Sequence, residues 1–150
     1  MLFRVCKIEN TYLICSRYGK ILRQNVRSKK WTVVKGTKNL GYLVMSIDGK
    51  SYRMHRVIAH AFEILDLHDK LQIDHIDLDK TNNCIFNLRP ATPQQNQFNM
   101  NAKGYTWHKR DKKWQAQIAL NGKTIHLGYF DKEAEAHQKY LEAKKKYHPL

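Results

Sequence analysis

Long apolar runs are missing from this 150-residue sequence, and their absence excludes two classes of protein. A membrane-spanning helix needs roughly 20 consecutive apolar residues, and no run approaches that length. The N-terminal stretch is interrupted by Arg4 and Lys7, so it lacks the apolar core of a secretory signal peptide. We therefore expect a soluble, cytoplasmic protein with no membrane partner.

Cysteine is also scarce. Cys6, Cys15 and Cys84 are odd in number and form no CxxC pair, which argues against a disulfide framework and against a structural zinc site. We expect buried free thiols. Low-complexity tails are absent, and with 42% hydrophobic residues the chain can bury a core of its own. The length fits one domain or two small ones.

Acidic residues are few, and they are unevenly distributed. Residues 1–50 hold 11 Lys and Arg against 2 Asp and Glu, residues 51–100 hold 5 against 6, and residues 101–150 hold 11 against 5. Two basic flanks suit a polyanion such as a nucleic acid, and the central third keeps its carboxylates for a cation. A merely solvated basic surface would give the same counts.

The first third predicts a small antiparallel sheet. Its expected strands are 12–16, 20–23, 31–34, 42–47 and 51–53, and Asp48-Gly49 is a strong signal for a two-residue hairpin. A basic stretch around Trp31 lies between strands and could follow a DNA groove or form an exposed loop. The residues that we assign to DNA here are Arg27, Lys29, Lys30 and Lys35.

One helix is predicted over residues 53–67. Its apolar residues recur at the i, i+3, i+4, i+7 spacing of a single helical stripe. His55 and Arg56 stand off this stripe where the helix begins, and we expect Arg56 to meet a DNA phosphate there.

The central stretch, 71–99, contains the residue types that could form a catalytic site. A short apolar run ends at Asp74 and His75, a polar loop follows, and a second apolar run, 84–88, contains Asn87. Strand, loop and strand is the economical prediction. A helix then begins after Thr92, with Pro93 at its first position and a capping box completed by Gln95. Asn96 falls in the first turn, facing the strands. A carboxylate, an imidazole and two amides suit a small site for a hard metal ion that activates water.

These residues carry a resemblance. VIAHAF followed by IDHIDLDKTNNCIFNLRPATPQQNQFN resembles the HNH endonucleases, in the homing-endonuclease branch where asparagine replaces the last histidine. The resemblance implies a ββα-metal fold that holds one divalent metal, Mg²⁺ or Mn²⁺. It implies that Asp74 and Asn96 are metal ligands, that His75 is the general base, and that Asn87 braces the loop and orients the base.

Four neighbours of these residues belong to the same hypothesis. Asp77 and Asp79 are interpreted as turn formers. Leu78 departs from the family, in which glycine is common at this place. Arg89 is expected either to contact the DNA phosphate or to form a structural ion pair.

The last third predicts three strands and a helix. Alternating apolar residues mark the strands, Asn121-Gly122 a hairpin, and Asp131 a helix cap. Residues 103–147 resemble the DNA-binding domain of plant ethylene-response factors, which implies that the outward sheet face lies in the major groove. The residues at matching positions are Lys103, Thr106, His108, Gln117, Thr124 and His126. We assign Trp107 and Trp114 to the core.

Together these expectations describe an α+β protein. It has N-terminal antiparallel β elements (1–53), a ββα-metal HNH nuclease core with its preceding helix (54–101) and a C-terminal three-stranded sheet plus helix (102–150). The expected function is a monomeric, metal-dependent homing endonuclease that nicks double-stranded DNA in a bacterial or phage-infected cell. The alternatives are a catalytically inactive DNA-binding protein, a repressor or architectural factor, and an RNA-binding protein.

Overall fold

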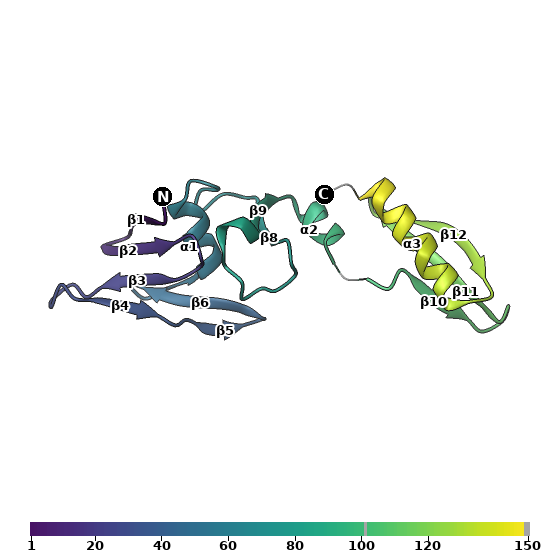
Figure 1. The fold of residues 1–150 in the computed structure, drawn as a ribbon, viewed down its shortest axis with the longest axis horizontal. Helices are drawn as coiled ribbons and strands as arrows, with labels where there is room; N and C mark the ends of the chain where they lie inside the picture. Colours follow the sequence, from purple (N-terminus) through teal and green to yellow (C-terminus); the bar gives the residue numbers. More distant parts are fainter. Residues whose placement is uncertain (101, 149–150) are drawn as a thin grey trace. The chain divides into compact units, whose positions relative to one another are not determined.

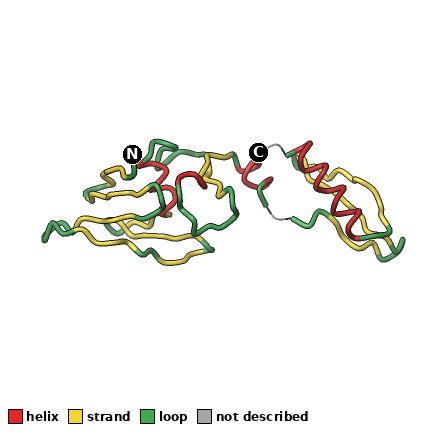
Figure 2. Tube along the Cα trace, in the orientation of Figure 1, coloured by secondary structure: helices red, strands yellow, loops and turns green. Residues whose placement is uncertain are grey.

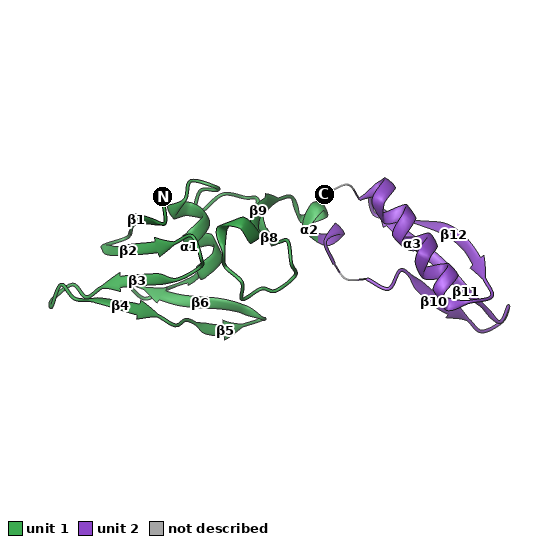
Figure 3. Cartoon of the chain, in the orientation of Figure 1, with its two compact units in different colours: residues 1–96 green, residues 97–150 purple. Residues whose placement is uncertain are grey.

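The computed structural model describes residues 1–100 and 102–148. The chain forms two compact units, residues 1–96 and residues 97–150 (Figure 3). Both units combine antiparallel sheets with a few helices (Figures 1 and 2). The mixed α and β composition that the sequence predicts is confirmed at this coarse level.

A four-stranded antiparallel sheet opens unit 1. Strands β1 (Phe3–Ile8), β2 (Thr11–Ser16), β3 (Ile21–Gln24) and β4 (Trp31–Val34) lie in chain order. Alternation along the strands turns Leu13, Cys15 and Ile21 inward, and all three are fully buried. This inner face forms one side of the core of unit 1.

A second sheet leads into the first helix. It consists of β5 (Thr37–Asn39), β6 (Tyr42–Ile47) and β7 (Lys50–Arg53). The predicted hairpin at Asp48-Gly49 is confirmed, because both residues have positive φ, 47° and 79°. Helix α1 (Met54–Ala61) follows directly and buries Val57 and Ile58 completely.

Helix α1 is shorter than predicted. The apolar stripe continues to Leu65 in the sequence, but the helix ends at Ala61, and Glu63 adopts a left-handed φ of 60°. The amide of Ile64 still bonds the carbonyl of Ala59 at 2.9 Å. The residues after the helix therefore keep packing on the core as a turn, which a periodic pattern alone does not distinguish from further helix.

The central motif is a two-stranded ribbon followed by a short helix. Strand β8 (Gln72–His75) pairs with β9 (Leu88–Ala91), a 3-10 turn η1 (Ile85–Asn87) precedes β9, and α2 (Pro93–Phe98) closes the motif. The predicted second strand, 84–88, is wrong in its position. Residues 85–87 form η1 because the amide of Asn87 bonds the carbonyl of Cys84, and pairing with β8 begins only at Leu88.

Unit 1 has one core rather than two. Buried side chains from β1 to β3, from β6, from α1 and from the β8–β9 ribbon belong to a single cluster. Within unit 1, the N-terminal strands and the central motif bury their apolar faces against the same helix, α1.

Unit 2 contains a three-stranded sheet and a helix. Strands β10 (Tyr105–His108), β11 (Lys113–Leu120) and β12 (Lys123–Phe130) pair in chain order, and α3 (Glu133–Tyr147) packs on them. The apolar residues Ile118, Tyr140 and Ala143 form its core. The hairpin at Asn121-Gly122 is confirmed, with φ of 51° and 74°.

Two predicted details of unit 2 are wrong. The residue before α3 is Lys132 rather than Asp131, whose carboxylate instead lies 3.3 Å from the Lys113 ammonium. Trp107 is 46% exposed instead of buried. It lies on edge strand β10 and contacts the half-buried Trp114 edge to face, with ring centroids 5.1 Å apart.

Two expectations about composition can be compared with the structure. All three cysteines are free: Cys15 is buried, and Cys6 and Cys84 are half-buried. A hydrogen bond with Cys6 and burial raise the pKa of Cys15, which makes it unreactive. In residues 1–100 and 102–148, no helix has the length and apolar character that crossing a membrane requires.

Candidate active site

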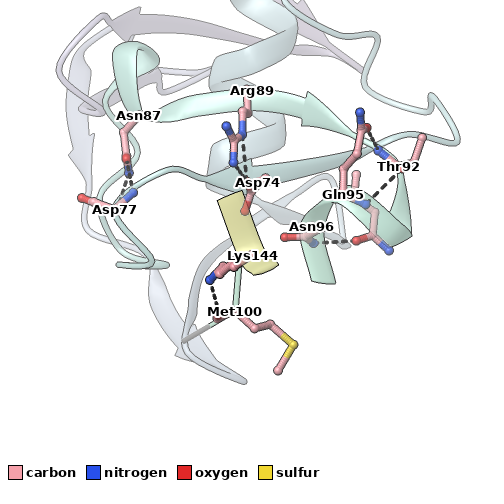
Figure 4. Close-up of polar contacts among 10 residues, drawn as sticks. Asp74, Asp77, Asn87, Arg89, Thr92, Gln95, Asn96, Met100 and Lys144 are labelled. Carbon is pink, nitrogen blue, oxygen red and sulfur yellow. Dashed lines mark hydrogen bonds and ion pairs between the residues drawn. The ribbon is translucent and has the colours of Figure 1, made fainter. Parts of the chain in front are cut away.

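Asp74 and His75 end strand β8, and both side chains are buried. Their exposed fractions are 3% and 4%. Register places Asp74 opposite Arg89 and His75 opposite Leu88 on β9. Arg89 donates from Nε and Nη2 to Asp74 Oδ2 at 2.9 and 2.6 Å (Figure 4). Of the two contacts expected for Arg89, the structure shows the ion pair.

Asn96 is presented by α2, and a capping box fixes the start of this helix. The Thr92 amide donates to Gln95 Oε1 at 2.9 Å, and the Gln95 amide donates to Thr92 Oγ1 at 3.2 Å (Figure 4). The predicted capping box is therefore confirmed. Asn96 Nδ2 donates to Gln72 Oε1 on β8 at 2.6 Å. Because the nitrogen is engaged with Gln72, the carbonyl oxygen is the end of this amide suited to a cation.

The donor set fits a hard divalent cation. A buried carboxylate and an amide oxygen are ligands that Mg²⁺ and Mn²⁺ accept, and two protein ligands leave room for water and phosphate. In the described part of the chain, no three His, Cys, Asp or Glu side chains gather into a metal site. A cation bound here would depend on Asp74, Asn96 and non-protein oxygens, and it would share Asp74 with Arg89.

The imidazole of His75 lies in a closed environment. Its Nε2 is 3.3 Å from Asn83 Oδ1, and its ring centroid is 5.0 Å from His55 and 5.9 Å from Tyr42. Burial lowers the pKa of His75 below its usual value, although the bond to Asn83 and the carboxylates of the neighbouring loop oppose the shift. The ring is therefore neutral near pH 7, the state in which imidazole accepts a proton.

Asn87 ties the loop after β8 together. Its Oδ1 accepts from the Asp77 amide at 2.9 Å, and its Nδ2 donates to Asp77 Oδ1 at 2.8 Å and to the Asn82 carbonyl at 2.9 Å. Figure 4 shows Asn87 pointing at Asp77. Its backbone carbonyl also accepts from the Ile76 amide at 2.9 Å. Asn87 thus closes residues 76–82 into a compact loop beside His75.

The rest of that loop consists of turns. Asp77 Oδ1 accepts from the Asp79 amide, and Asp79 Oδ1 accepts from the Thr81 amide, both at 2.9 Å. The interpretation of Asp77 and Asp79 as turn formers is consistent with these bonds. Leu78 has a φ of 68°, the left-handed conformation that glycine adopts without strain.

The basic residues around Trp31 that we assigned to DNA lie in two places. Arg27, Lys29 and Lys30 lie together in the exposed turn between β3 and β4, where Asn25 Oδ1 accepts from the amides of Arg27 and Ser28. Lys35 is exposed beyond the opposite end of β4.

Arg56 is placed differently from the phosphate contact that we expected. Its guanidinium donates to backbone carbonyls of the loop after α1, at distances of 2.8 to 3.3 Å. These acceptors are Asp66, Leu67, Asp69 and Leu71. Arg56 therefore orders the segment that leads into β8.

In unit 2, most of the assigned residues share the sheet face opposite α3. Buried Ala116 and Ile118 of β11 face the helix, so Gln117 between them faces away, and His126 lies opposite Gln117. The residues Thr106, His108 and Thr124 alternate onto the same outer face. Lys103 precedes β10, and its carbonyl lies 3.1 Å from the His137 ring.

Sequence reasoning missed four residues of these sites. His55 and Asn83 contact His75. The sequence pattern around His55 predicts only a helix, and the pattern around Asn83 predicts only a loop. On the outer face of unit 2, Gln115 Nε2 lies 2.6 Å from His126 Nδ1, and the Tyr129 ring contacts His108 at 5.5 Å. Strand alternation could have identified Gln115 and Tyr129, whereas the contacts of His55 and Asn83 depend on tertiary packing.

Comparisons with known proteins agree with the central motif. Residues 52–98 match a family model described as HNH endonuclease. An uncharacterized HNH endonuclease of Acanthamoeba polyphaga mimivirus is 33% identical over 118 residues, covering 74% of this chain and 63% of that protein. Protein 3.8 of Escherichia phage T7 is 36% identical over 59 residues, covering 34% and 49%. The chain therefore spans less than two thirds of either relative.

Among solved structures, the HNH homing endonuclease I-HmuI, described for DNA binding and cleavage, is 23% identical. The match covers 76% of this chain and 70% of that one, with a TM-score of 0.44. Independently of that likeness, the family-model match over residues 52–98 and the viral relative show that this chain is similar to HNH endonucleases.

Proposed function

We propose that the chain is a metal-dependent DNA endonuclease of homing type that nicks one strand as a monomer. The observation that carries the proposal is the ββα motif itself, which presents buried Asp74 and His75 from β8 and Asn96 from the capped helix α2. The proposed setting is the cytoplasm of a bacterial or phage-infected cell. Double-stranded DNA is the proposed substrate.

Each residue has a distinct task in phosphodiester hydrolysis. His75, neutral because its pKa is lowered, takes the proton of the attacking water. Asp74 and Asn96 would hold one Mg²⁺ or Mn²⁺. When bound, the cation supplies charge stabilisation for the pentavalent phosphate and the leaving 3′ oxygen. Asn87 keeps loop 76–82 closed beside the base.

Two surfaces would hold the DNA. The exposed turn with Arg27, Lys29 and Lys30 is proposed to contact phosphates in unit 1. In unit 2, the face opposite α3 is proposed to enter the major groove, as the resemblance to ethylene-response factors implies. Its shorter polar side chains, Gln117 and Thr124 among them, suit contacts with base edges. Each unit would thus bring its own DNA contacts.

Cleavage of supercoiled plasmid by the purified chain tests the proposal. With Mg²⁺ or Mn²⁺ we expect nicked circles, and with EDTA none. His75→Ala should lower the nicking rate by about 10² to 10⁴ and leave the Kd for DNA nearly unchanged. His68→Ala is the matched control, because His68 is exposed and its hydrogen bond to Asp66 uses the backbone amide.

The same assay separates the proposal from an inactive DNA-binding protein. That second candidate rests on the Arg89–Asp74 ion pair, which occupies part of the proposed ligand carboxylate. A chain that binds plasmid tightly and leaves it supercoiled with either metal would identify an inactive binder. Equal cleavage by His75→Ala would remove His75 as the base.

A further inference from the structure

The bond between His75 and Asn83 joins two buried side chains. Asn83 is 3% exposed and His75 4%, and the bond spans the loop between them. A neutral imidazole carries its proton on one nitrogen only, and its hydrogen-bond partner selects which. With Asn83 Oδ1 as the acceptor, Nε2 holds the proton and Nδ1 holds the lone pair of the base.

The backbone that carries Asn83 is supported from the N-terminal sheet. The turn between β2 and β3 lies directly against it: a Cβ built on Gly19 would be 2.9 Å from the Asn83 carbonyl carbon. In the same turn, the Arg17 carbonyl accepts from the Ile85 amide at 2.9 Å. The Asn83 amide also bonds the Thr81 carbonyl at 3.1 Å. The backbone of Asn83 is therefore contacted by the turn between β2 and β3 and by Thr81 of its own loop.

Two aromatic side chains limit the rotation of the base. The His55 ring meets His75 edge to face at an interplanar angle of 85°, and the Tyr42 ring is tilted by 45°. Tyr42 itself carries the Arg53 guanidinium at 4.6 Å and the Lys80 ammonium at 4.8 Å over its ring. Packing around the ring and the bond at Nε2 therefore restrain the orientation of the His75 imidazole.

We propose that Asn83, backed by the Gly19 turn, is a positioning residue that fixes the catalytic tautomer of His75. The inference rests on the proposed function, because it assumes that His75 is the base. It adds that the N-terminal sheet is part of the nuclease, since the turn after β2 holds Asn83 in place.

The tautomer is measurable without cleavage. Long-range ¹H–¹⁵N spectra of the full chain at pH 8, where the ring is neutral, distinguish protonated from unprotonated ring nitrogens. We expect His75 to be protonated at Nε2 in the wild type and in Asn83→Asp, which keeps an acceptor. Asn83→Ala should give a mixture. Protonation at Nδ1 in the wild type would mean that the amide donates through Nδ2, which overturns the proposal.

A glycine pair tests the support from the N-terminal sheet. Gly19→Ala and Gly49→Ala both place a side chain at positive φ, 87° and 79°, but a Cβ at Gly49 meets nothing within 4 Å. Both variants therefore carry similar backbone strain. Only Gly19→Ala should disturb the tautomer spectrum of His75. Equal spectra for the two variants would remove the Gly19 turn from the proposal.

Kinetics complete the test. Asn83→Ala and Gly19→Ala should lower kcat for nicking by roughly 10- to 100-fold, the range seen for residues that orient a site's ligands. The KM and the Kd for DNA should stay within about twofold of the wild type. Asn83→Asp should recover part of the lost rate, and Gly49→Ala should keep it. Unchanged kcat in Asn83→Ala would refute the positioning role.

The two hypotheses fail in different ways. A wild type that shows Nε2 protonation but nicks no DNA contradicts the proposed function and leaves the Asn83 contact established. A wild type that nicks DNA with His75 protonated at Nδ1 contradicts the role of Asn83 alone.

Discussion

Leu78 stores backbone strain in the loop beside the base. A left-handed φ costs a non-glycine residue about 1 to 2 kcal/mol, and Leu78, at φ 68°, is half-exposed. We predict that Leu78→Gly raises the free energy of unfolding by about 0.5 kcal/mol, because relief of strain exceeds the entropy that glycine loses.

Urea denaturation of Leu78→Gly measures this gain, and Leu40→Gly is its matched control. Leu40 has a similar φ of 49° and is 82% exposed, so it loses less burial on substitution. The gain at Leu40 should be the larger of the two. A loss of stability at both positions would show that the left-handed residues are not strained.

His55 makes stability depend on pH. Burial, and then electrostatic repulsion from the neighbouring groups His75, Arg53 and Arg56 when the imidazole takes up a proton, lower the pKa of His55 to about 3. In the unfolded chain His55 binds a proton near pH 6.5, whereas in the folded chain it stays neutral down to about pH 3. The free energy of unfolding is therefore highest above about pH 6.5 and falls as the pH decreases toward 3. The slope reaches about 1.4 kcal/mol per pH unit.

The change that tests this is His55→Phe, which keeps an aromatic ring against Tyr42 and His75. Unfolding free energies measured at pH 7.5, 6.0 and 4.5 should decline less steeply in the variant than in the wild type. Because His75 also has a lowered pKa, some decline should remain. If the unfolding free energies of the variant and the wild type decline equally with falling pH, other groups cause the pH dependence.

At the scale of elements, the cap of α2 links helix stability to the metal site. Thr92→Ala removes the hydroxyl that accepts from the Gln95 amide and should cost about 1 kcal/mol. Asn96 follows Gln95 in the same first turn, so its amide oxygen would be held less firmly and Mn²⁺ affinity should fall. Calorimetric titration measures the affinity, with Thr92→Ser as the control that keeps the hydroxyl. Equal affinity in both variants would separate the cap from the metal site.

Local signals predicted several elements well. The capping box at Thr92 and the two hairpins with Asp48-Gly49 and Asn121-Gly122 depend on residues next to one another, so sequence suffices. The end of α1 and the start of β9 were misplaced because an apolar stripe continues where the chain turns. Contacts such as Gly19 with Asn83 join segments more than sixty residues apart, and no local pattern encodes them.

For the candidate site, the sequence supplied residue types and the structure supplied their partners. Asp74, His75, Asn87 and Asn96 were identified from a motif, and their catalytic and ligand roles remain predictions. The sequence left Arg89 open between a phosphate contact and an ion pair, and it did not indicate that Asp74 is the partner or that Arg56 bonds backbone carbonyls. A basic side chain near a site has the same sequence signature whether it binds phosphate or stabilises a loop.

At the scale of the whole molecule, unit 2 is expected to supply much of the DNA affinity. Residues 101–150 contain 11 Lys and Arg, and each phosphate contact adds about 0.9 to the slope of log K against log salt. Deleting residues 103–150 should therefore weaken binding and flatten that slope. Residues 1–96 have a core of their own, so the truncated chain should remain folded.

Substitutions on the outer face of unit 2 can distinguish contacts with bases from contacts with phosphates. Gln117→Ala together with Thr124→Ala removes neutral side chains that are proposed to meet base edges, so sequence preference should relax while the salt slope stays constant. Binding titrations from 50 to 300 mM salt, on a preferred and a scrambled duplex, measure both quantities. If deletion of residues 103–150 leaves the salt slope unchanged, the phosphate contacts lie in unit 1. If the double variant changes the slope, the outer face contacts phosphates rather than bases.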